Sequence, residues 1–187
     1  MIVLITGILN SYYSSVGNKI NFPIGVINNL ALSYVAFKNN NYGLVIFNLL
    51  FFMPINIKGY FEWNKNSNKD VVENRGLGLK KGVITIILSI VTGLLVAYLL
   101  QLIPGERLTY LDSFTNVISF IAGILLMLRY NESWILYLVN NVLDLTLWII
   151  NFSSGGFDSL MVLLMSVMYL VINIYALFKW RDKNERL

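Results

Sequence analysis

Seven apolar stretches, parted by short polar turns and one long polar segment, constrain this chain more than any other feature. The stretch at 82–103 carries no charge over about twenty residues, which is the length an α-helix needs to cross the hydrocarbon core of a bilayer. Only 13% of the residues are charged, against about 25% in a typical soluble domain. The sequence therefore predicts an all-α membrane protein with seven transmembrane helices, at about 2–16, 22–37, 42–63, 82–103, 113–128, 134–150 and 160–180.

The polar segment at 64–81 divides the chain. It shows no apolar periodicity and is predicted to be a hydrophilic linker. The helix that follows it is broken by Pro104 and Gly105. We therefore expect a first group of three helices within 1–63, a cytoplasmic linker at 64–81, a connecting helix at 82–103, and a second three-helix group with a basic tail within 110–187.

The basic residues predict the orientation of the chain in the membrane. With the N-terminus outside, 12 of the 14 Lys and Arg residues fall on the inner side, and only Lys38 and Arg107 fall outside. Cytoplasmic loops are enriched in Lys and Arg, and an odd number of spans places the two chain ends on opposite sides. We expect a multi-pass protein of the cell membrane with a cytoplasmic C-terminus.

The chain also contains an internal repeat. The segment from Phe51 to Trp63 matches that from Met168 to Trp180, including an Asn and the final Trp of each. Upstream, Asn28 and Asn29 match Asn140 and Asn141. Two such triplets joined by one extra helix form a parallel repeat about an axis along the membrane normal, with the substrate site near the midplane between the repeats. The prediction is a 3+1+3 arrangement whose paired asparagines face the site.

A polar and aromatic stripe runs along the helix predicted at 134–150. Its members step by three or four residues, so they share one helix face: Trp134, Tyr137, Asn141, Asp144 and Trp148. A carboxylate near the bilayer midplane costs roughly 2.5–3.5 kcal/mol unless it faces protein or water. Asn140 adds an amide beside the stripe. We interpret the stripe as the wall of a substrate cavity; the alternative is a polar seam that only holds helices together.

Further candidates lie on the repeated segments. Asn56 and Asn173 precede Trp63 and Trp180 by seven residues, about 10 Å inside the membrane interface, and their amides suit an uncharged polar ligand. Pro54 is expected to kink the helix beside Asn56. Asn48 and Tyr169 are weaker candidates at the same depth, and Trp63 and Trp180 themselves are expected to be interfacial anchors.

The residue types exclude several functions. The chain has no Cys and no His, and it lacks phosphate loops, metal-ligand clusters and nucleophile–base pairs, so neither a cofactor nor a metal is expected. A single aspartate at the midplane, with no His, Cys or second carboxylate nearby, is not enough for catalysis, which argues against an enzyme. The basic linker is more simply a topology signal than a nucleic-acid site.

The order of the helices, the motif P-x-N-x-x-G-x-x-x-W from Pro54 to Trp63, the helix containing Trp134 and the terminal K-W-R at 179–181 resemble the PnuC-type transporters of B-vitamin precursors. The resemblance covers nearly the whole chain. It implies a 3+1+3 fold like that of the SWEET sugar transporters, facilitated diffusion of nicotinamide riboside, and trapping by a cytoplasmic riboside kinase. Its partners would be this small molecule and the lipid bilayer, and a homo-oligomer stays open.

Two departures from the family pattern fall on the predicted site. The family has W-x-x-W where this chain has Trp134-x-x-Tyr137, and it has Gln where Asn56 stands. An aromatic face attracts a desolvated cation by roughly 2 kcal/mol, which suits the pyridinium ring of the riboside. Thiamine is also cationic and aromatic. The alternatives are therefore a carrier of thiamine or another nucleoside-like vitamin, or a structural membrane protein that transports nothing.

Overall fold

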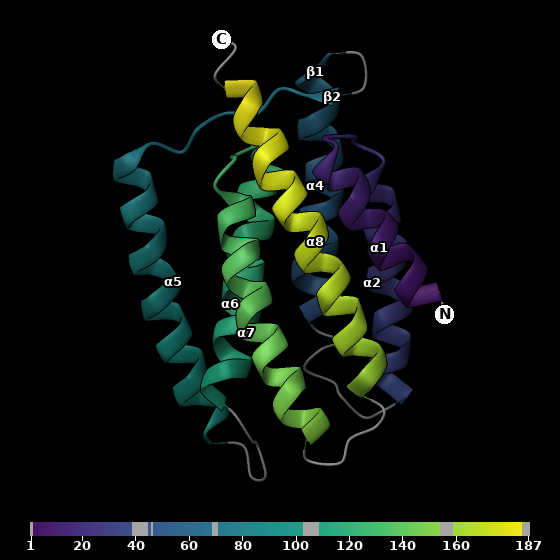
Figure 1. Ribbon diagram of the computed structural model, residues 1–187, viewed down its shortest axis with the longest axis vertical. Coiled ribbons are helices and arrows are strands. Elements are labelled where there is room, and N and C mark those ends of the chain that lie inside the picture. Colours follow the sequence, from purple (N-terminus) through teal and green to yellow (C-terminus); the bar gives the residue numbers. More distant parts are fainter. Residues whose placement is uncertain are drawn as a thin grey trace.

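The computed structural model describes residues 2–38, 45, 47–68, 71–102, 109–153 and 159–184. The helices lie roughly along the long axis of the molecule (Figure 1). They are α1 (Ile2–Ser15), α2 (Asn21–Lys38), the π-helical η1 (Phe47–Phe52) continued by α4 (Met53–Lys65), α5 (Leu79–Leu100), α6 (Thr109–Met127), α7 (Ser133–Ser153) and α8 (Ser159–Asn184). Two strands of two residues each, β1 (Ser67–Asn68) and β2 (Val71–Val72), pair as an antiparallel hairpin. The predicted all-helical fold is confirmed.

Six of these helices close into a ring. Contacts run from α1 to α2, to α4, to α6, to α7, to α8 and back to α1, whereas α5 packs outside the ring against α6. Large apolar side chains on α5 are exposed, and its buried positions are the small residues Ser89, Gly93 and Ala97. The Ser113 hydroxyl of α6 donates to the Gly93 carbonyl at 2.5 Å. A helix that is apolar around most of its circumference and exposed is one that faces lipid.

Length and composition alone identify three spans in the described part of the chain: Leu79–Leu100, Thr109–Met127 and Leu163–Trp180. The other helices fall in the remaining four predicted stretches, and α1 is only 14 residues long. The ring helices line a polar interior, which explains why some of them are less apolar than α5.

The irregularity expected at Pro54 is a π-helical segment. η1 ends at Phe52, and Pro54 occupies the first turn of α4. Proline has no N–H and its ring displaces the carbonyl four residues earlier, so the preceding turn widens. Phe52 and Asn56, on either side of this junction, both face the interior of the ring.

The two ends of the helix bundle differ, and the end that carries β1 and β2 is called here the hairpin end (Figure 1). There the α1–α2 and α6–α7 turns adopt similar backbones, with Gly17 at φ 76° and Arg129 at φ 68° two residues after the preceding helix. Glycine adopts this conformation freely, whereas another residue is strained by roughly 1 kcal/mol. Arg129 is held there by an ion pair with Glu62 at 3.3 Å.

The segment predicted to be a plain linker packs across both of these turns. The Val72 amide donates to the Gly17 carbonyl at 2.9 Å, and the Arg75 amide donates to the Arg129 carbonyl at 3.0 Å. Val72 and Leu77 are buried. α5 begins at Leu79, inside the predicted linker range. The segment therefore ties the hairpin ends of the two helix groups together.

The prediction that Trp63 and Trp180 anchor the chain at the membrane interface is wrong. Both side chains are fully buried, with ring centroids 5.8 Å apart. The Trp63 indole donates to the Leu126 carbonyl and the Trp180 indole donates to the Ser15 carbonyl, each at 3.0 Å. Carbonyls at the C-terminal end of a helix have no partner within the helix. The two indoles satisfy such groups at the ends of α6 and α1, which is why they turn inward.

Candidate functional site

The ring encloses a cavity of about 290 Å³, at the small end of the range for small-molecule sites. Side chains from η1 and from all six ring helices line it. Seven of the eight site residues predicted from the sequence are among them: Asn56, Trp134, Tyr137, Asn140, Asn141, Asp144 and Asn173. The eighth, Asn48, is buried in η1 and is not among the lining residues.

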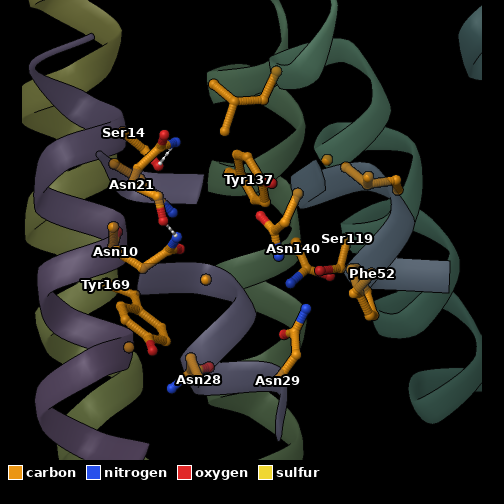
Figure 2. A pocket seen from close by; sticks show the side chains of 18 of the residues that line it. Asn10, Ser14, Asn21, Asn28, Asn29, Phe52, Ser119, Tyr137, Asn140 and Tyr169 are labelled. Atoms are coloured by element: carbon orange, nitrogen blue, oxygen red, sulfur yellow. Dashed lines mark hydrogen bonds between the residues drawn. The ribbon is translucent and has the colours of Figure 1, made fainter. Parts of the chain in front are cut away.

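The predicted stripe on α7 forms one wall. Trp134 is buried, and its ring lies 5.7 Å from that of Tyr137 at an interplanar angle of 48°, which gives a continuous aromatic surface. Figure 2 shows Tyr137 and Asn140 together on one side of the cavity. The Trp148 side chain lies outside the described residues. The wall therefore combines an aromatic surface with amide groups, as helical spacing predicted.

Part of the stripe also joins helices. The Asn173 amide donates to the Asn141 amide oxygen, and the Ser166 hydroxyl donates to the Asp144 carboxylate at 2.5 Å. Both bonds connect α7 to α8. The alternative interpretation of the stripe, a seam between helices, therefore holds for Asn141 and Asp144 while they also line the cavity.

The opposite wall, from α1 and α2, is polar. Most of its residues were not predicted as site residues from the sequence. Asn10 donates to the Asn21 backbone carbonyl, and the Asn21 amide donates to the Ser14 hydroxyl, both at 2.7 Å (Figure 2). Asn28 donates to the Val3 carbonyl at 2.8 Å. The signal available in the sequence was that Asn10 and Ser14 stand four residues apart in an apolar stretch and so share a helix face.

Close packing at Gly25 positions Asn56. A Cβ atom on Gly25 would lie 2.7 Å from the Asn56 amide oxygen and 2.8 Å from the Asn10 amide nitrogen. No side chain fits there without moving the two amides. Gly25 is thus the reason that polar groups of α1 and α4 both reach this part of the cavity.

The charge of the cavity is distinctive. Among the described lining residues Asp144 is acidic and none is Lys or Arg. Anionic ligands such as phosphate esters are usually bound by Arg, Lys or helix N-termini. The cavity is suited instead to a polar ligand that is neutral or carries a positive charge.

A ring of helices with an apolar outer surface and a polar, aromatic-walled interior defines a multi-pass membrane protein with a site for a small polar solute. The comparison with known sequences gives the particular family. The sequence profile described as nicotinamide mononucleotide transporter matches residues 1–182. The chain belongs to this family of membrane transporters, and the resemblance inferred from the sequence motifs is confirmed.

Relatives within the family are similar over the whole chain. The nicotinamide riboside transporter PnuC of Neisseria mucosa is 31% identical over 99% of this chain and 72% of the relative. The protein of the same name from Haemophilus influenzae is 32% identical, covering 100% of this chain and 80% of the relative. A crystal structure described as the vitamin B3 transporter PnuC superposes with a TM-score of 0.82 at 30% identity, covering 99% of this chain and 81% of that one.

Proposed function

We propose that this protein carries nicotinamide riboside across the cell membrane. The observation that carries the proposal is the cavity itself, in which the Trp134–Tyr137 surface faces a wall of amides. The pyridinium ring is cationic and favours an aromatic face, while the carboxamide and the ribose hydroxyls need hydrogen-bonding partners. The names of the relatives, which describe riboside transporters, support the same substrate.

The charge of the cavity favours the riboside over the mononucleotide in the family's description. The mononucleotide adds a phosphate, and no basic side chain is found among the described lining residues. A phosphate in a site with Asp144 and without Arg or Lys would lose its hydration without replacement. We expect the mononucleotide to bind at least tenfold more weakly, about 1.4 kcal/mol.

Thiamine is the second candidate substrate, because two lining residues differ from the family pattern. Tyr137 and Asn56, where the family has Trp and Gln, both line the cavity. Tyr and Asn are smaller than Trp and Gln, so they alter the space available to a ring and its substituents. Thiamine is cationic and aromatic and could use the same wall.

We infer that the fold is a 3+1+3 arrangement of seven spans, with α1, α2 and η1–α4 related to α6, α7 and α8. The similar turns at Gly17 and Arg129 support this, as do the exchanged hydrogen bonds of Trp63 and Trp180. The hairpin end is assigned to the cytoplasm because it carries the α1–α2 turn, the segment before α5 and the α6–α7 turn, which the predicted topology places on the inner side, rich in basic residues. The N-terminus of α1 then faces outward.

The proposed mechanism is alternating access without ion coupling. The indole bonds and the 71–77 segment join the two helix groups at the hairpin end, and we propose that they keep the cavity closed on that side. Among the described lining residues Asp144 has no second ionisable carboxylate beside it to form a proton relay. Net uptake would then depend on the substrate gradient and on phosphorylation by a cytoplasmic riboside kinase.

Calorimetric titration of the purified protein tests the substrate. Nicotinamide riboside, its mononucleotide, thiamine, riboflavin and deoxynucleosides are titrated side by side into wild type and Trp134→Ala. We expect binding of the riboside, weakened in Trp134→Ala by at least about 1 kcal/mol. Binding of thiamine alone would leave the proposed fold unchanged and would identify thiamine, not the riboside, as the substrate. Binding of none of them, with Trp134→Ala changing only thermal stability, would favour a structural role.

A further inference from the structure

The repeated asparagines of the two helix groups are used differently. In the second group Asn141 and Asn173 are hydrogen-bonded to each other. Their counterparts in the repeat are Asn29 and Asn56. Among the described residues no bond joins this first pair, and the Asn29 amide nitrogen is buried without a partner. The same sequence feature therefore stabilises helix packing in one group and leaves a hydrogen-bonding group unused in the other.

The two helix groups also differ in the size of the aromatic side chains at matching positions of the repeat. Trp134 and Tyr137 of α7 correspond in the repeat to Phe22 and Gly25 of α2. The second group thus supplies the Trp134–Tyr137 surface together with amides, and the first group supplies amides and the space beside Gly25. A ligand with one aromatic and one polar side would have a single preferred orientation in this cavity.

A second unpartnered group lies on the first group's wall. Asn21 is 1% exposed and Asn29 is 8% exposed, and both line the cavity. The Asn21 amide oxygen, like the Asn29 amide nitrogen, is buried without a partner. On the α7 wall the Trp134 indole nitrogen and the Asn140 amide oxygen are likewise buried without a partner. A buried polar group left unpaired costs about 1–3 kcal/mol, and native proteins rarely keep one without a reason. Together Asn21 and Asn29 offer one acceptor and one donor.

The orientation of Asn21 is fixed by its neighbours. Its amide nitrogen donates to Ser14, and its backbone carbonyl accepts from Asn10. These bonds leave the amide oxygen as the group that is free to accept. Asn10 and Ser14 are accordingly positioning residues, which set the direction of Asn21.

We infer that Asn21 and Asn29 form a hydrogen-bonding subsite on the first group's wall, in addition to the unpartnered groups of Trp134 and Asn140 on α7, and that this subsite selects the polar part of the substrate. Asn21 accepts from a hydroxyl or an amide N–H, and Asn29 donates to a hydroxyl or carbonyl oxygen. The Asn141–Asn173 pair, by contrast, mainly holds α7 against α8. This inference rests on the proposed function, because it takes a riboside with a carboxamide as the ligand.

The test combines variants of the protein with variants of the ligand. Asn21→Leu and Asn29→Leu are titrated with nicotinamide riboside, with its 2′,3′-dideoxy form and with the pyridine riboside that lacks the carboxamide. Asn131→Leu is the matched control, because its amide oxygen is also buried without a partner but Asn131 is not among the residues that line the cavity. Thermal unfolding is measured for every variant, and Asn21→Ser and Asn29→Ser replace any leucine variant that does not fold.

We expect Asn21→Leu and Asn29→Leu each to bind the riboside about fivefold or more weakly than wild type and to lose discrimination against at least one analogue. Asn131→Leu should keep the wild-type affinity and discrimination, because its side chain does not line the cavity. If the α2 variants weaken all three ligands equally, or none, the subsite is wrong although the substrate stands. If wild type binds no riboside, the proposed function fails and the inference with it.

Discussion

Removal of the two inward-facing indole donors should open the hairpin end of the cavity. Trp63→Phe and Trp180→Phe keep an aromatic ring and delete the N–H groups that bond Leu126 and Ser15 at 3.0 Å. Each bond crosses from one helix group to the other. If the groups move apart when the cavity opens, these bonds exist only in the closed state, and their loss shifts the population toward the open state.

The magnitude follows from burial. Both indoles are at most 2% exposed. Trp63→Phe leaves the Leu126 carbonyl bonded to the Arg129 amide at 2.9 Å, whereas Trp180→Phe leaves the buried Ser15 carbonyl without its indole partner. That loss is worth about 1–3 kcal/mol, and every 1.4 kcal/mol changes a population ratio about tenfold. Trp180→Phe should therefore raise the open-to-closed ratio roughly 5- to 100-fold, and Trp63→Phe, which removes one of two bonds to its carbonyl at about 0.5–1.5 kcal/mol, roughly 2- to 10-fold. Because the two indoles also contact each other, the effects of the double variant need not add.

Thiol labelling measures this ratio directly, because the chain has no native cysteine. A single Ser11→Cys places a thiol on the cavity wall, and a membrane-impermeant maleimide is added from the hairpin side of oriented vesicles. The labelling rate should rise in both tryptophan variants. Phe61→Leu and Phe178→Leu, exposed positions two residues earlier on the same helices, are the controls and should not change it. Unchanged labelling in folded tryptophan variants would refute the argument that these bonds close the cavity.

Three further predictions follow from single contacts. Asp144→Asn should weaken binding of the cationic riboside more than binding of an uncharged analogue, because a charge about 8 Å away at an effective dielectric of about 20 contributes about 2 kcal/mol. Calorimetry with both ligands measures this difference in affinity, and an equal loss of affinity for the two ligands would contradict the prediction. Gly25→Ala should impair riboside binding by displacing Asn56 and Asn10, and wild-type affinity would show that the amides can move freely. Glu132→Gln should weaken the carboxylate contact with the Leu77 amide at 2.9 Å and lower the unfolding temperature modestly, whereas Glu73→Gln, on an exposed residue, is the control.

The sequence predicted the helices and the α7 wall because both depend on local periodicity. Apolar length identifies a helix in a membrane, and steps of three and four residues place Trp134 to Asp144 on one face. The position of Pro54 likewise predicted where the third helix becomes irregular. These features need no knowledge of which helices are neighbours.

The missed features depend on tertiary contacts. Trp63 and Trp180 occupy the ends of spans, where tryptophan is most often found at the membrane interface. In the structure their indoles point inward because they donate to carbonyls at the ends of α6 and α1. Asn21 stands at the start of its helix, where an asparagine is usually a cap. Only the ring arrangement shows that this side chain lines the same cavity as Trp134.

Uptake of labelled nicotinamide riboside into proteoliposomes shows whether this protein carries the riboside without an energy source. The purified chain is reconstituted without ATP, kinase or ion gradient, and uptake is followed with and without an uncoupler and in Trp134→Ala. We expect saturable uptake that equilibrates the riboside across the membrane, is unaffected by the uncoupler and is reduced in Trp134→Ala. Uptake that is absent from wild-type vesicles, or that collapses when the uncoupler is added, would contradict it.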